Sequence, residues 1–250
     1  MRQTTELIEI RVTPLRVPDL AASLVAEFLG PFTFIFAGIA ATAVANEGAG
    51  NLITIGLAYG LAIGLMVAAM GHISGAHFNP AVTIGMFLAG KIDLVKGVLY
   101  IVAQLAGTAA AAGLLKYILN DLPFDAVKAG VPALSGAVDE GQGLLLEIIM
   151  TFFLVMVIFG TAVDPRAGHR AVAGLAIGLA VTMDTFLGGP LTGAAMNPAR
   201  SFGPAAVANE WADAWIYWVG PIVGAALAAL LFSTVLMSAE EEAVPFEQPV

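Results

Sequence analysis

The chain has 250 residues, of which 59% are hydrophobic and only 12% are charged, and its net charge is −9. Soluble domains carry about 25% charged residues, so this composition excludes an ordinary soluble protein and predicts a polytopic membrane protein. Cysteine is absent, which excludes disulfides, thiolate metal sites and cysteine nucleophiles. The three histidines form no cluster at metal-ligand spacing, so we expect neither a metal nor another cofactor.

The chain begins with a polar segment, residues 1–19, which lacks the apolar core of a signal peptide and is predicted to be an N-terminal tail. A helix that crosses a bilayer needs about 20 apolar residues. Six such segments follow, at about 20–44, 52–70, 94–115, 143–163, 170–187 and 212–237. The acidic end, residues 238–250, is predicted to be a solvated, disordered tail.

Two further apolar stretches, at about 79–89 and 197–208, each begin with Asn-Pro and are too short to cross a bilayer. Proline suits the first turn of a helix, where no backbone donor is needed. We therefore expect two half-helices that enter the membrane without crossing it.

The distribution of lysine and arginine predicts the orientation, because cytoplasmic loops are enriched in them. With the N-terminus inside, and Arg200 set apart, seven lie inside and two outside. The seven are Arg2, Arg11, Arg16, Lys91, Lys96, Arg166 and Arg170, and the two are Lys116 and Lys128. Both termini are therefore predicted to be cytoplasmic.

The chain is also an internal duplication. Asn79 and Asn197 are 118 positions apart, and Glu27 and Glu147 are 120 apart. Each half, about 20–115 and about 143–237, contains three spans and one half-helix, so the second half must be inverted relative to the first. Inverted repeats place functional sites near the midplane, at broken helices. The predicted fold is an all-α membrane domain over residues 20–237, in which the two half-helices meet from opposite faces.

The windows around the two half-helices, "SGAHFNPAVT" and "TGAAMNPARSFGP", each contain Asn-Pro-Ala. Two such boxes at mirrored positions among six spans closely resemble the aquaporin, or major intrinsic protein, family. The resemblance implies a passive channel for water, a homotetramer of independently conducting monomers and a place in the cell membrane. We also expect a prokaryotic source, and lipid, water and small neutral solutes rather than nucleic acid as partners.

The Asn-Pro-Ala boxes, Asn79-Pro80-Ala81 and Asn197-Pro198-Ala199, are the predicted centre of the pore. A helix N-terminus carries about half a positive charge, so two such ends at the midplane would repel cations. The Asn amides can donate to a passing water and also cap the half-helices. The plainer alternative is a pair of ordinary helix caps.

The loops before the boxes contain few large polar side chains. Non-helical backbone at membrane depth must be buried or line a watery cavity. Their carbonyl groups are the expected acceptors for solute hydrogens, at Gly75, Ala76, His77, Gly193 and Ala195.

The acids Glu27 and Glu147 occupy matching places in the two halves. Buried acids in membranes often bind protons or ions, whereas the resemblance implies that these two hold the re-entrant loops in place. Ion coupling and simple interfacial exposure are the alternatives. His77 belongs either to the same support or to a cytoplasmic gate.

The expected selectivity filter is Arg200, directly after the second box, with three residues implied by gap-free alignment to the family: Tyr59, Thr185 and Ala194. Strict water channels have His at the position of Thr185, and Ala194 is small, so this filter is expected to be wider or less polar on that side. Tyr59 in place of the usual Phe either recovers some of the lost width or offers its hydroxyl. The alternative is that Tyr59 and Thr185 are packing residues only.

Other positions separate the subfamilies. Glycerol facilitators carry Asp after the pore Arg and a basic residue four positions later, whereas this chain has Ser201 and Ala205. The aromatic residues Tyr217 and Trp218 are also typical of water-type members. Asp184, where an apolar residue is usual, is expected either at the outer vestibule, against a neighbouring loop, or at an exposed mouth position without a special role.

A passive water channel, which also passes small neutral solutes such as glycerol or ammonia, is therefore the predicted function. The alternatives are a glycerol or small-solute facilitator, an ion-coupled secondary transporter with Glu27 and Glu147 as coupling sites, and a structural junction protein. An enzyme is not expected, because no nucleophile–base pair or cofactor loop is visible.

Overall fold

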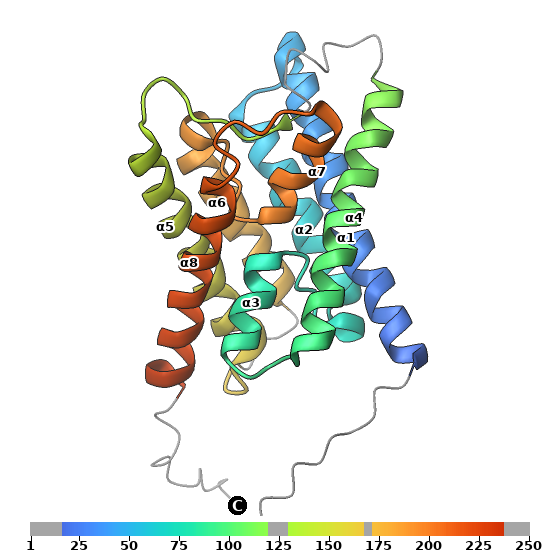
Figure 1. Cartoon of the computed structure of the whole chain (residues 1–250), viewed down its shortest axis with the longest axis vertical. Coiled ribbons are helices and arrows are strands. Elements are labelled where there is room, and N and C mark those ends of the chain that lie inside the picture. The colour runs from blue at the N-terminus through green and yellow to red at the C-terminus, as the bar shows by residue number, and fades with distance from the viewer. Residues whose placement is uncertain (1–16, 120–129, 168–171, 238–250) are drawn as a thin grey trace, which may run out of the picture.

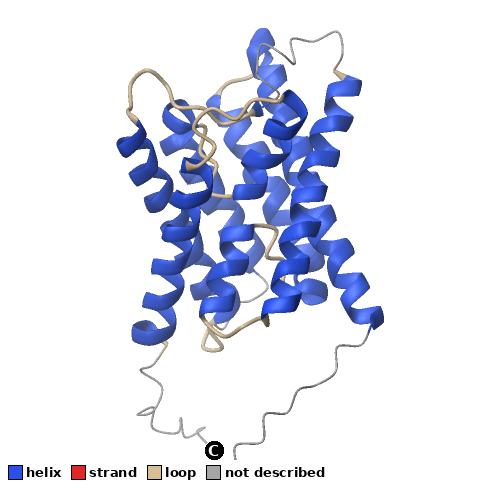
Figure 2. Ribbon diagram, in the orientation of Figure 1, coloured by secondary structure: helices blue, strands red, loops and turns tan. Residues whose placement is uncertain are grey.

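The computed structural model describes residues 17–119, 130–167 and 172–237, and every regular element within these ranges is a helix (Figures 1 and 2). The predicted tails, apart from residues 17–19, lie outside the described residues, as do Lys128 and Arg170.

Six long helices run along the molecule and form a bundle (Figure 1). They are α1 (Val17–Val44), α2 (Leu52–Ser74), α4 (Leu94–Ile118), α5 (Glu140–Ile158), α6 (Ala173–Thr192) and α8 (Ile216–Leu231). Short π-helical turns extend three of them: η1 (Ala45–Ala49), η3 (Phe159–Val163) and η5 (Phe232–Leu236). Among the described residues six helices are long and apolar enough to cross a membrane, which confirms the predicted number.

The two short helices are α3 (Pro80–Leu88) and α7 (Pro198–Ala208). Figure 1 shows α3 in the half of the bundle where the described chain ends and α7 in the opposite half. Each begins at the proline of an Asn-Pro step, with the asparagine as its cap, and its N-terminus points toward the middle of the bundle (Figure 1). The predicted pair of re-entrant half-helices is therefore present.

Two long helices extend further than hydropathy predicts, since α2 continues past residue 70 and α6 past residue 187. Their last turns contain His72 and Pro190, which ended the apolar patterns early. Both helices stop where a glycine adopts a left-handed conformation, Gly75 with φ 91° and Gly193 with φ 83°. Only glycine adopts this conformation freely, so the glycine is the true stop signal in each half.

Close helix contacts depend on the glycines of α2 and α6, which pack on each other over much of their length. A Cβ on Gly64 would lie 2.7 Å from the carbonyl oxygen of Gly174, and one on Gly60 would collide with that of Gly178. Small residues let membrane helices approach closely. The glycine spacing in the sequence is compatible with contacts within or between monomers, and these contacts lie within one chain.

Candidate functional site

Both half-helices begin with the same cap. Asn79 Oδ1 accepts from the backbone N–H of Ala81 at 2.8 Å, and Asn197 Oδ1 accepts from that of Ala199 at 2.9 Å. A proline follows each Asn at the first helical position. Asparagine and proline at these positions satisfy or remove the unpaired donors of a helix start.

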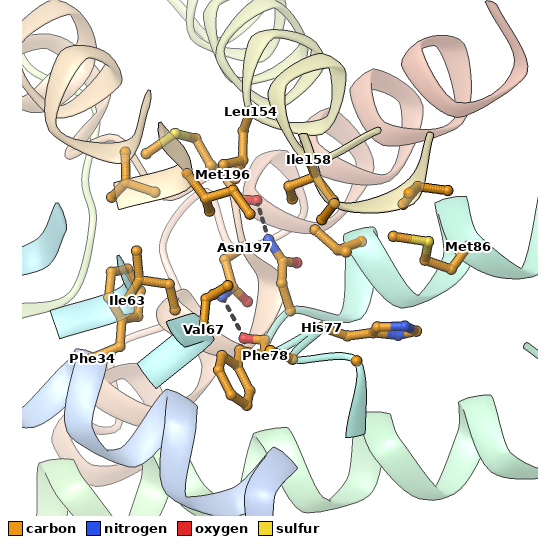
Figure 3. A pocket seen from close by; sticks show the side chains of 18 of the residues that line it. Phe34, Ile63, Val67, His77, Phe78, Met86, Leu154, Ile158, Met196 and Asn197 are labelled. Atoms are coloured by element: carbon orange, nitrogen blue, oxygen red, sulfur yellow. Dashed lines mark hydrogen bonds between the residues drawn. The ribbon is translucent and has the colours of Figure 1, made fainter. Parts of the chain in front are cut away.

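Each Asn also bonds the other half of the molecule. Asn79 Nδ2 donates to the carbonyl oxygen of Met196 at 2.8 Å, and Asn197 Nδ2 donates to that of Phe78 at 3.0 Å. Figure 3 shows these two bonds as dashed lines on opposite sides of the point where the loops meet. An amide group has two N–H donors, so each Asn keeps a second donor. Because each Asn also bonds the other loop, the two asparagines do more than cap two separate helices.

The loops before the half-helices repeat one unusual backbone conformation. Positive φ angles occur at Ala76 (50°) and Phe78 (51°), and at Ala194 (46°) and Met196 (52°). Left-handed backbone costs a non-glycine residue about 1–2 kcal/mol. The same strain at matching positions of both loops indicates that their carbonyl directions are set by the surrounding structure rather than by local preference.

A cavity of about 210 Å³ lies against both loops, on the side of the molecule that contains α3 (Figure 3). Of the five predicted acceptor residues, four line it: Gly75, Ala76, His77 and Ala195. Gly193 does not line it, and its carbonyl oxygen instead accepts from Arg200 Nη2 at 3.2 Å. Most of the other lining residues are apolar, among them Phe34, Ile63, Leu154, Ile158 and Val181.

The two predicted acids are fully buried, which excludes interfacial exposure. Glu27 accepts from the backbone N–H groups of His77 and Phe78 at 2.9 and 2.8 Å. Glu147 accepts from those of Ala195 and Met196 at 2.9 and 2.7 Å. Each also accepts from the hydroxyl at the end of the preceding helix, Ser74 at 2.6 Å or Thr192 at 2.7 Å.

Sequence reasoning missed three contributors to this support. Tyr100 and Tyr217 donate to the carbonyl oxygens of Ser74 and Thr192, at 2.7 and 2.9 Å. Gln104 Nε2 donates to Glu27 at 2.7 Å. The two tyrosines are 117 positions apart, so the repeat spacing alone could have identified them as a pair.

His77 contacts the support and also lines the cavity. Its Nδ1 lies 3.2 Å from Thr83 Oγ1, and its ring packs edge-on against Tyr100 with 5.3 Å between ring centroids. Thr83 in turn accepts from Gln104 at 3.1 Å. The imidazole is therefore part of the hydrogen-bonded network around the first loop.

All four predicted filter residues are buried, with exposed fractions of 4–5%. Arg200 donates through Nη1 to the carbonyl oxygen of Gly130 at 2.8 Å and through Nη2 to the Tyr59 hydroxyl at 3.2 Å. The Tyr59 ring also lies beneath the guanidinium group, 5.2 Å from centroid to Cζ. Thr185 donates to the carbonyl oxygen of Val181 in its own helix at 2.7 Å. Its O–H is therefore not a free donor, unlike the ring N–H of a histidine at the same place.

Asp184 does not lie at an exposed mouth, because its side chain is 0% exposed. The alternative of an exposed mouth position is therefore wrong, because Asp184 lies inside α6, which continues to Thr192. Among the described residues neither of its carboxyl oxygens has a hydrogen-bond partner. Within the same ranges no group of three or more His, Cys, Asp or Glu could hold a metal ion.

Comparisons with known proteins agree with this geometry. The family described as "Major intrinsic protein" matches residues 15–232. "Probable aquaporin TIP-type" of Medicago truncatula is 41% identical over 91% of this chain and 92% of its own length. "Aquaporin TIP2-1" of Arabidopsis thaliana is 41% identical over 86% of this chain and 88% of its own.

A solved structure, that of the aquaglyceroporin from Plasmodium falciparum, is similar with a TM-score of 0.80 and 25% identity, covering 88% of this chain and 98% of that one. The curated relatives are plant proteins, so the expectation of a prokaryotic source is not borne out. Family and fold make the protein a multi-pass membrane channel rather than an enzyme. The chain belongs to the major intrinsic protein family.

Proposed function

We propose that this channel conducts mainly water, in single file, between the two Asn-Pro-Ala boxes. The observation that carries the proposal is the reciprocal pair of bonds from Asn79 to Met196 and from Asn197 to Phe78. These bonds place two helix N-termini head to head at the centre of six apolar helices. The remaining amide donors supply hydrogen bonds to a water oxygen where the helix ends are positive.

The carbonyl groups of the two loops form the acceptor path on either side of this point. Glu27 and Glu147 hold the loops through their backbone N–H groups, and each uses both carboxylate oxygens for that purpose. An acid occupied in this way is a support rather than a transport site. This occupation argues against ion coupling through either residue.

Ion exclusion is assigned to the half-helix ends together with Arg200. A cation at the centre would lose its hydration shell and meet two positive helix ends, and the arginine adds a full charge at the filter. Arg200 is held by three acceptors: Gly130, Tyr59 and Gly193. Its charge is therefore fixed in place before a solute arrives.

Small neutral solutes such as glycerol or ammonia are a second candidate cargo. Ala194 is small, and the hydroxyl of Thr185 is bonded to its own helix, so one side of the filter lacks a strong donor. Against a dedicated glycerol facilitator stand Ser201 and Ala205, which replace the acidic and basic residues of that class.

We also propose the orientation of the channel and the membrane in which it lies. The excess of lysine and arginine on one side supports cytoplasmic termini, and we assign the channel to the cell membrane. Apolar side chains such as Leu61, Leu65 and Leu179 are more than half exposed on the bundle. This outer surface suits lipid and the neighbouring subunits of a homotetramer.

Osmotic shrinkage of proteoliposomes tests the proposal, with water and glycerol measured on the wild type and on Thr185→His. Wild-type vesicles should shrink several times faster than bare lipid, without a dependence on a pH gradient. The substitution should lower glycerol flux more than water flux, because histidine narrows the filter and adds a donor. Folded protein that is no faster than lipid overturns the proposal, and equal effects on both solutes remove Thr185 from the filter.

A further inference from the structure

The segment that precedes α5, residues 130–135, crosses the end of the bundle at which α7 lies (Figure 1). We call this segment the strap. It belongs to neither repeat, because the repeats cover about 20–115 and about 143–237. Gly130 and Pro132 are nevertheless buried. Connecting segments normally run over the surface of a protein, so the burial of the strap needs a specific cause.

Two contacts fix the strap to the second re-entrant loop. The backbone N–H of Ser135 donates to the carbonyl oxygen of Leu191 at 2.8 Å. Pro132 lies so close to Gly193 that a Cβ on this glycine would be 2.9 Å from the Cα of the proline. Leu191 and Gly193 come shortly before Ala194, so the strap is held beside one of the proposed filter residues.

Gly130 extends the strap to the arginine of the filter. Its carbonyl oxygen accepts from Arg200 Nη1 at 2.8 Å, which is the shortest of the three hydrogen bonds to the guanidinium group. The other two bonds both use Nη2, and each is 3.2 Å long. Among the described residues Gly130 is therefore the acceptor on which the Nη1 side of the group depends.

The backbone at Gly130 leaves no room for a side chain. Its φ angle is 77°, in the left-handed region that glycine adopts freely. A Cβ would also lie 2.6 Å from Cγ1 of Ile39, which is 0% exposed in α1. An alanine at this position must change its φ angle or move away from Ile39. Either change turns the carbonyl group away from Arg200.

We propose that Gly130 is a positioning residue for the selectivity filter and acts on the solute through Arg200. Without its carbonyl group the guanidinium pivots on the two Nη2 bonds, and the width of the filter fluctuates. The widest openings admit glycerol more often, whereas water already passes the undisturbed filter. The inference rests on the proposed function, and it adds a determinant of selectivity outside the four residues expected from the motifs.

The test is the ratio of glycerol to water permeability in proteoliposomes. Gly130→Ala should raise this ratio roughly threefold, because Arg200 loses one hydrogen bond and keeps two. Gly48→Ala is the control for backbone strain, since Gly48 has a φ angle of 81° and nothing within 4 Å of an added Cβ. Gly136→Ala adds a methyl group next to the strap, also with nothing within 4 Å. Both controls should keep the wild-type ratio.

A second substitution separates the position of the carbonyl group from stability. Ile39→Ala removes the side-chain carbons that a Cβ at residue 130 would meet, and alone it should keep the wild-type ratio. Combined with Gly130→Ala it should bring the ratio back toward the wild type, although the cavity in the core lowers the unfolding temperature further. A ratio that instead increases as stability decreases overturns the inference.

Pro132→Gly covers the case in which Gly130→Ala does not fold. It loosens the strap without adding atoms, so the ratio should rise in the same direction by a smaller amount. An unchanged or lower ratio in whichever of these two variants folds overturns the inference and leaves the channel standing. Wild-type vesicles that are no faster than bare lipid overturn the channel itself.

Discussion

The two re-entrant loops share one plan and differ in the residue directly after the Asn-Pro-Ala box. In each, an Asn caps a half-helix and donates to the other loop, a buried Glu holds the backbone, and a tyrosine bonds the end of the preceding helix. Arg200 comes after the second box, whereas Val82 comes after the first. The shared residues hold the two loops, and the residue that differs belongs to the filter that we propose. Both halves therefore contain the supporting residues, whereas only the second half has a positive charge directly after its box.

The supports also differ in strength. Glu27 accepts from Gln104 in addition to the loop amides and Ser74, whereas the repeat position of Gln104 is Pro221, which has no side-chain donor. Glu147 therefore accepts fewer hydrogen bonds than Glu27, although Arg200 also donates to the carbonyl oxygen of Gly193 in the second loop. Substitutions in matched pairs can show how far the two loops are equivalent.

The largest effect is expected when the acids are removed. Glu147→Leu leaves the loop amides of Ala195 and Met196 unpaired, at about 1–3 kcal/mol for each buried donor. Glu27→Leu should be less severe, because Gln104 Oε1, which has no partner among the described residues, can accept one freed amide. Thermal unfolding in detergent should show both variants destabilised, Glu147→Leu more so. The reverse order would show that the first loop is the weaker one.

The central asparagines should behave alike. Asn79→Ala and Asn197→Ala each remove a helix cap worth about 1 kcal/mol and one bond across the midplane. Both should lower the unfolding midpoint in denaturant by the same amount and reduce water permeability to a similar degree. A difference of more than about 1 kcal/mol between them, beyond the spread for single caps, would break the symmetry inferred from the geometry.

Arg200→Val makes the second box resemble the first. It removes the fixed positive charge and widens the filter, so glycerol permeability should rise roughly tenfold, which corresponds to about 1.4 kcal/mol of barrier. Vesicle swelling in glycerol measures this rise, and a pH-sensitive dye inside the vesicles reports any proton leak. Unchanged glycerol flux would place the limiting constriction elsewhere.

Tyr59→Phe is a smaller change in the same filter. It frees one N–H of Arg200 from the tyrosine hydroxyl, while the ring keeps its edge-on contact with Phe34 at 5.0 Å. Loss of one such hydrogen bond, about 1 kcal/mol, should raise water permeability by at most about fivefold. Tyr117→Phe, at an exposed tyrosine of α4, is the control and should leave the flux unaltered.

The smallest effect is expected at the ends of the first helices of the two halves, which both finish in a π-helical turn. After the turn η3, which ends the first helix of the second half, Arg166 pairs with Asp164 at 2.7 Å and holds the pKa of the Asp164 carboxyl below its usual range. A lowered pKa stabilises the fold above the unfolded value near about 3.9, and the gain disappears as the pH falls through the folded value. Asp164→Asn should therefore lower the unfolding temperature slightly at neutral pH and not at all in strong acid. An equal decrease at both pH values would contradict this origin.

Much of the fold was predictable because hydropathy and the Asn-Pro steps are strong local signals. Six spans, two half-helices and their inversion follow from lengths and from the odd number of spans in each half. The helix ends were less predictable, because Gly75 and Gly193 stop the helices beyond the apolar segments. Hydropathy does not detect a left-handed glycine.

The residues named at the candidate site were reachable from the motifs and the family resemblance, whereas the contacts among them were not. Nothing in the sequence indicates that Thr185 donates to its own helix or that Gly193 faces Arg200 rather than the cavity. Asp184 was misplaced for a related reason. A single acid near the end of an apolar segment looks exposed, and only the packing of α6 against α5 shows that it is buried.

The exchanged bonds between the loops bear on how the chain is made. A ribosome delivers Asn79 long before Met196, so its donor has no acceptor until the second half has entered the membrane. The first half then waits as three helices around an unfinished loop, and neither half contains a complete pore. Synthesised as two separate polypeptides, the halves would each need the other before either loop could take its final shape.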